Sequence, residues 1–145
     1  MDYKLELIVV PVSDVDKSLT FYTEGCGFSL DVDYHPTDDF RVVQLTPPGS
    51  ACSVQIGLGL TDAAPGSFLS TYLVVQDIEA AREELLARGV KVEPITHKHP
   101  LATWSGGTAK GVEPDRRDYA SFATFADPDG NTWMMQEIGY SGSGA

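Results

Sequence analysis

The side chains of this sequence that could do chemistry are few and scattered. His97 and His99 form an H-x-H pair, and on a strand this spacing would place both imidazoles on one face, where they could chelate a divalent ion. Because a loop begins at Pro100, we favour solvated side chains over a metal site here. Cys26 and Cys52 could act as nucleophiles only beside an imidazole, and the sequence does not reveal such a pair. These residues by themselves predict no reaction.

Four aspartates resemble catalytic carboxylates, but their positions are those of helix N-caps and turn residues. Asp14 and Asp77 each precede an amphipathic run, where a carboxylate accepts from the free N–H groups of a helix start. Asp127 and Asp129 belong to a DPDG turn. We therefore expect structural roles for all four. The Arg116-Arg117 pair, flanked by aspartates, is expected to be a solvated charge cluster rather than an anion clamp.

Composition and charge exclude several classes of function. The chain has no G-x-S-x-G elbow, no G-x-x-x-x-G-K-[ST] phosphate loop and no complete dinucleotide fingerprint. Its 10 basic and 21 acidic residues give a net charge of −11, which disfavours nucleic acid and anionic lipid and favours cationic ligands. No apolar stretch approaches the ~20 residues of a membrane helix. With only two cysteines and no signal-like segment, we expect a cytoplasmic protein that binds neither nucleic acid nor membrane.

An internal repeat organises the chain and must position any site. The pattern Val12–Asp16 (VSDVD) returns as Val75–Glu79 (VQDIE), 63 residues later. Each copy follows a strand-like run and opens a helix that ends near a glycine, Gly27 or Gly89. Further strand-like runs follow each helix. The chain therefore reads as one βα-plus-strands module used twice.

The repeat predicts a single domain, residues 1–145, made of two modules. The expected strands are residues 5–12, 28–34, 40–46 and 52–57 in the first module, and 68–75, 90–96, 119–126 and 132–138 in the second. The module boundaries are residues 1–58 and 68–138, with a linker at 59–67 and a loose tail at 139–145.

One long segment, residues 97–118, breaks the symmetry between the modules. It is rich in glycine and proline and has no clear period, and such loops are usually either functional or disordered. Trp104 stands among small residues within it. Two interpretations stay open: a mobile lid with an aromatic tip, and a surface excursion without function.

The βαβββ plan used twice, with strand–VxD–helix openings and a DPDG turn before the last strand, resembles the vicinal oxygen chelate (VOC) superfamily. That group includes glyoxalase I, bleomycin-resistance binding proteins and extradiol dioxygenases. The resemblance spans residues 5–138. It implies an α+β fold, with tandem βαβββ modules forming a curved mixed sheet around a central cavity. It also implies a homodimer.

In the metal-using members of this superfamily, four strand side chains hold a divalent ion. Leucine, valine, serine and methionine, which stand at the matching positions here, are poor ligands for such ions. A register slip of one residue would supply Gln55 or Met135 and rescue at most one ligand. We therefore predict no metal and no cofactor. The four matching positions are Leu7, Val54, Ser70 and Met134.

Strand alternation in phase with these four positions predicts the lining of the cavity. The lining is mostly apolar with a few polar points, a mixture typical of a small-molecule pocket, although a solid core is the competing interpretation. The predicted ligand-binding residues are Leu7, Val9, Val54, Ile56, Ser70, Tyr72, Trp104, Met134 and Gln136.

Three functions remain open at this point. The favoured one is a metal-free protein that binds a small organic molecule, as in sequestration of a drug or natural product. The second is a metal-independent enzyme acting on a similar substrate. The third is a metal-dependent lyase, isomerase or dioxygenase with a relocated ion. The sequence identifies no catalytic residue, so it leaves open whether the protein is an enzyme.

Overall fold

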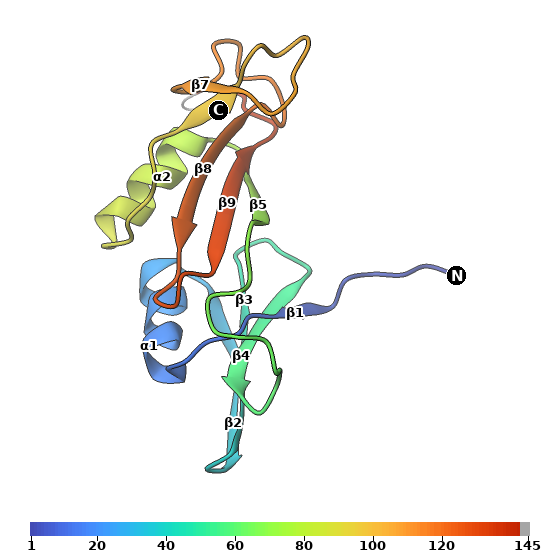
Figure 1. Cartoon of the computed structure of the whole chain (residues 1–145), viewed down its shortest axis with the longest axis vertical. Coiled ribbons are helices and arrows are strands. Elements are labelled where there is room, and N and C mark those ends of the chain that lie inside the picture. Colours follow the sequence, from blue (N-terminus) through green and yellow to red (C-terminus); the bar gives the residue numbers. More distant parts are fainter. Residues whose placement is uncertain (143–145) are drawn as a thin grey trace. The chain divides into compact units, whose positions relative to one another are not determined.

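The computed structural model describes residues 1–142, and the chain divides into two compact units (Figure 1). The first unit holds Met1–Leu69 and the turn Asp127–Asn131. The second holds Ser70–Ala126 and the chain from Thr132 onward. The predicted tail at 139–145 is therefore described only as far as residue 142. Within residues 1–142, no helix is long and apolar enough to cross a bilayer.

The first unit packs one helix against a four-stranded sheet of order β1-β4-β3-β2. Strand β1 is parallel to β4, and the other neighbours are antiparallel. The helix starts as predicted, because the Asp14 carboxylate accepts a hydrogen bond from the backbone N–H of Lys17 at 3.0 Å. The elements are β1 (Leu7–Val9), α1 (Val15–Thr20), a π-helical turn η1 (Phe21–Gly25), β2 (Ser29–Thr37), β3 (Phe40–Thr46) and β4 (Ser53–Leu58).

The DPDG turn of the second module belongs to the first unit, and its aspartates have the structural roles expected of them. The Asp127 carboxylate is buried and accepts from the Tyr22 hydroxyl at 2.7 Å and from the backbone N–H of Asp129 at 2.9 Å. The Asn131 side chain donates both to Asp127, at 2.8 Å, and to the carbonyl of Pro11, at 2.7 Å. This network joins two chain segments more than 100 residues apart.

Replacing Tyr22 with phenylalanine should destabilise this unit. The ring would stay in the core, but the buried Asp127 carboxylate would lose one donor, at a cost of about 1–3 kcal/mol. Urea unfolding of the variant would measure the change. Tyr3→Phe is the control, because Tyr3 is exposed, and equal stability of the two variants would contradict the prediction.

The second unit packs α2 on one face of a five-stranded sheet of order β5-β9-β8-β6-β7 (Figure 1). Strand β5 is parallel to β9, as β1 is to β4 in the first unit. The two helices and two mixed sheets confirm the predicted α+β class. The elements are β5 (Thr71–Val75), α2 (Ile78–Ala87), β6 (Thr96–Lys98), β7 (Thr108–Lys110), β8 (Ser121–Ala126) and β9 (Thr132–Glu137).

One predicted strand of the second unit is displaced. The strand expected at 90–96 is reduced to an isolated bridge at Val92, because Pro94 cannot donate to a ladder. Pairing resumes only at Thr96, so β6 runs into the segment expected to be a loop. That segment, 97–118, is therefore not wholly irregular: it contains most of a hairpin made by β6 and β7.

The expectation that Arg116 is a solvated charge is wrong. Its guanidinium donates to the fully buried Glu137 carboxylate at 2.6 and 2.8 Å, and it lies 3.5 Å from the centre of the Tyr140 ring. The hydrogen bonds to Glu137 raise the pKa of Arg116 above its ordinary value. Glu137 also accepts from the backbone N–H of Ile78, the first residue of α2, at 2.9 Å. The ion pair therefore fixes the start of α2 against β9.

Candidate ligand pocket

The face of the second sheet that lies away from α2 carries the candidate site. Along β9, Trp133, Met135 and Glu137 are buried, so Met134 and Gln136 point to the other face. Their cross-strand neighbours share that face. They are Tyr72 and Thr124 beside Met134, and Val74 and Phe122 beside Gln136.

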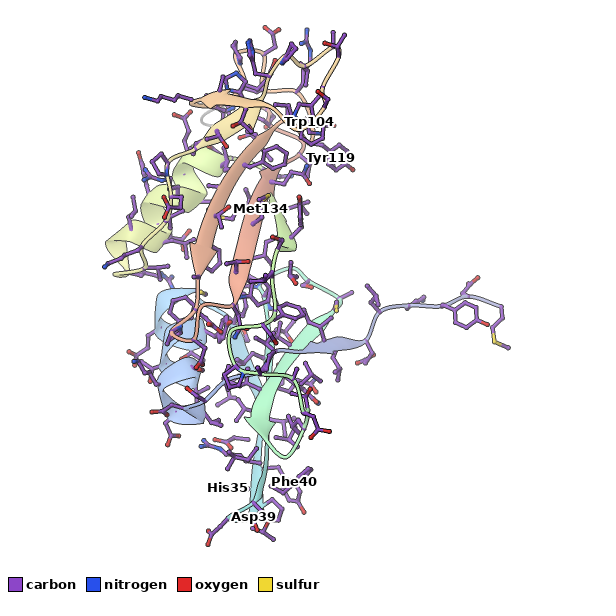
Figure 2. All side chains as sticks on the ribbon, in the orientation of Figure 1. His35, Asp39, Phe40, Trp104, Tyr119 and Met134 are labelled. Carbon is purple, nitrogen blue, oxygen red and sulfur yellow. The ribbon has the colours of Figure 1, made fainter. Side chains whose placement is uncertain are left out.

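One wall over this face comes from the segment between β6 and β7. The Trp104 ring stacks beside Phe122, with the ring centroids 6.4 Å apart and the planes at 29°. The indole N–H donates to the carbonyl of Gly107 at 2.7 Å, which holds the ring in this orientation. Figure 2 places Met134 partway along β8 and β9, and Trp104 near one end of these strands.

Together the face and the wall border a pocket of about 370 Å³ within the second unit, and this pocket is partly open to solvent. This volume is within the usual range for small-molecule sites, and aromatic and apolar side chains alternate with threonine hydroxyls around it. The pocket is lined by Tyr72, Glu93, Pro94, Thr96, Trp104, Gly106, Thr108, Phe122, Ala123, Thr124 and Met134.

Three residues predicted from the sequence, Tyr72, Trp104 and Met134, meet in this pocket. Gln136 shares the sheet face, but its amide donates to the carbonyl of Tyr119 at 2.9 Å. Ser70 precedes β5 with a φ of 62°, so it lies outside the strand alternation from which it was predicted.

The prediction that Val54 and Ile56 face a cavity is wrong. Their exposed fractions are 2% and 0%, and they pair with Leu45 and Val43 on the core side of the first sheet. The prediction aligned β4 with β9, the last strand of each module, by the turns that precede them. The connection before β4 spans residues 47–52, one residue more than the connection 127–131 before β9. One extra residue moves every following side chain to the opposite face.

Polar side chains lie on the face of the first sheet opposite Val54 and Ile56, and the sequence analysis named one of them, Gln55, only as the result of a register slip. Leu7 and Val9 lie on this face, and their partners on β4 are Ser53 and Gln55. The Gln55 amide donates to the Gln44 side chain at 3.1 Å. Counting alternation from the correct start of β4 would have found both polar residues.

The sequence profile of the glyoxalase/bleomycin resistance protein/dioxygenase superfamily matches residues 4–135. The chain belongs to this superfamily. No curated protein gives a significant match to it.

Several solved structures of the superfamily are similar to this chain over almost its whole length. TnmS3, an antibiotic binding protein from Streptomyces sp. CB03234, is 29% identical with a TM-score of 0.70, covering 94% of this chain and 96% of that one. A glyoxalase/bleomycin resistance protein from the same strain is 29% identical with a TM-score of 0.68, covering 92% and 100%. A superfamily member from Sphaerobacter thermophilus DSM 20745 is 26% identical with a TM-score of 0.68, covering 94% and 98%.

The residues present do not fit the divalent ion that metal-using members of the superfamily hold. Residues 1–142 contain no group of three or more His, Cys, Asp and Glu side chains that could bind a metal. At the matching positions, Leu7 and Met134 are unsuitable donors, and the correction from Val54 to Gln55 adds only one carboxamide. His97 and His99 belong to no such group in residues 1–142, and His97 Nδ1 donates a hydrogen bond to the Gly111 carbonyl at 2.8 Å.

Proposed function

We propose that this superfamily member binds a small aromatic organic molecule in the pocket of the second unit, without the divalent ion of its metal-using relatives. The observation that carries the proposal is the aromatic wall. Trp104 stacks beside Phe122 above a sheet face that also presents Tyr72 and Met134. A flat ligand would bind between this wall and the strands, and both of its faces would bury apolar area.

Hydrogen-bonding groups around the pocket are few and suited to orienting a ligand. Thr96, Thr108 and Thr124 contribute hydroxyl groups, and the Tyr72 phenol lies beside them. The residues that line the described pocket include neither histidine nor cysteine, and Glu93 is the one carboxylate among them. This composition supports reversible binding, as in sequestration of a drug or natural product, over catalysis. The similarity to TnmS3, an antibiotic binding protein, supports the same choice.

The homodimer, the cytoplasmic location and the exclusion of nucleic acid and membrane as partners stay predictions from the sequence. The ligand-binding roles of Leu7, Val9, Ser70 and Gln136 are likewise untested. Of these, Leu7, Val9 and Gln136 are partly exposed.

Thermal unfolding in the presence of polycyclic aromatic natural products tests the proposed function. A ligand present at about 100 times its Kd should stabilise the protein by about 2.7 kcal/mol, which raises the Tm by about 5–10 °C in a chain of this size. Mass spectrometry should then recover the ligand unchanged. Recovery of a product would instead favour the metal-independent enzyme. Stoichiometric Fe, Mn, Ni or Zn that activity requires would favour the metal-dependent alternative.

A further inference from the structure

The hairpin of β6 and β7 contributes Thr96 and Thr108 to the lining of the pocket, and it places Lys98 and Lys110, which are not among the lining residues, beside them. Its cross-strand pairs are Thr96 with Lys110 and Lys98 with Thr108. Thr96 also pairs with Phe122, so these four side chains share the sheet face of the pocket. His97, one residue along, pairs with the buried Ser121 and points to the opposite face.

Lys98 is held against the aromatic wall. Its ammonium lies 4.5 Å from the centre of the Trp104 ring and 5.7 Å from that of Phe122, both within the range of cation–π attraction. In residues 1–142, the salt bridges to carboxylates are made by arginines, and Lys98 makes none. An ammonium has three N–H donors. The two rings attract its charge but do not take up all three donors, so donors are left for a ligand.

We infer that Lys98 recognises an acidic group on the aromatic ligand of this pocket. The inference rests on the proposed function and names the ligand class: an aromatic molecule that carries a carboxylate, sulfonate or ionised phenol. The rings hold the ammonium in place before the ligand arrives, so little side-chain freedom is lost on binding. Hydroxyl groups of Thr96 and Thr108 lie on the same face and can donate to the same acidic group.

A cationic ligand, which the net charge of −11 would favour, fits this wall less well. The aromatic faces that would attract a ligand cation already hold the Lys98 ammonium, which would repel it. Glu93 could attract a cation from the rim of the pocket. The net charge acts on long-range approach and is screened by salt, whereas Lys98 acts at contact distance.

Two dyes that differ by one acidic group test the inference. Anilinonaphthalene sulfonate (ANS) is N-phenylnaphthylamine with an added sulfonate. The affinity for the neutral dye measures binding to the aromatic pocket alone, and the affinity for ANS also includes any recognition of the sulfonate. The Lys98→Met variant keeps the length of the side chain and removes its charge. It should weaken ANS binding about three- to tenfold. Its affinity for N-phenylnaphthylamine should not change.

Two further variants control the experiment. Lys98→Arg should retain ANS binding, because it restores the cation. Lys91→Met removes the same charge from an exposed lysine between α2 and β6, and it should leave both dyes unaffected. Unchanged Tm values would exclude unfolding as the cause of a loss.

The outcomes separate the inference from the function on which it rests. If Lys98→Met leaves ANS binding unchanged, strengthens it, or weakens both dyes equally, Lys98 does not recognise an acid and the inference is wrong. If the wild-type protein binds neither dye, the aromatic pocket itself fails, and the inference fails with it.

Discussion

Replacing Trp104 with alanine should lower the affinity of the protein for N-phenylnaphthylamine by about 30-fold or more. The substitution removes the indole that stacks beside Phe122 and forms one side of the pocket. Truncation of an aromatic anchor that a bound ligand covers typically costs about 2 kcal/mol or more, which corresponds to this factor. Fluorescence titration with the dye measures the change.

Trp104→Phe is the matched control for this experiment, because it keeps an aromatic plane and should retain most of the affinity. Neither variant should lose much stability, since the Trp104 side chain is 43% exposed and lies outside the core. The chain has two tryptophans, and the other, Trp133, is buried in the core. If Trp104→Ala binds the dye as tightly as the wild type does, the aromatic wall is not part of the binding site and the prediction is wrong.

Replacing Arg116 with alanine should destabilise the protein by about 3–5 kcal/mol. The Glu137 carboxylate has an exposed fraction of 0%, and Arg116 contributes two of its short hydrogen bonds. Without Arg116, a buried negative charge would keep only the backbone N–H of Ile78 among the partners described above. Chemical denaturation followed by circular dichroism would measure the loss.

A second substitution shows whether the uncompensated charge is the cause. In Arg116→Ala combined with Glu137→Gln, the charge is gone, so the double variant should be more stable than Arg116→Ala alone. Arg117→Ala is the control at the neighbouring position, where the side chain is 60% exposed. It should cost under about 1 kcal/mol, because its buried partner Glu113 would still accept from the backbone N–H groups at positions 115 and 117. A double variant less stable than Arg116→Ala would contradict the explanation.

Local rules predicted the parts of the fold that depend on local chemistry. Asp14 and Asp77 cap the two helices as expected, because an N-cap needs only its own side chain and the next turn of backbone. The repeat of the VxD pattern predicted two modules, each opening on such a capped helix. Tyr72 and Met134 were placed together correctly, since β5 and β9 follow simple alternation from well-marked starts.

The failures occurred where one element had to be registered against another. Val54 and Ile56 were assigned to the wrong face because the length of a turn, which local pattern does not fix, decides the phase of β4. Phe122 and Thr96 were missed as pocket residues because their position depends on how β6 pairs with β8 and β7. Arg116 was expected in solvent, but it donates to the carboxylate of Glu137, which lies 21 residues away in the sequence.

The sequence by itself determined the helix starts and the α+β class, because each depends on residue type and short spacing. Only the tertiary structure decided which strand residues face outward and which aromatic rings meet. It also decided that the Lys98 ammonium lies over the rings of Trp104 and Phe122. The physical reason is that a strand side chain points to one of two faces, and pairing with a distant strand, rather than local propensity, selects between them.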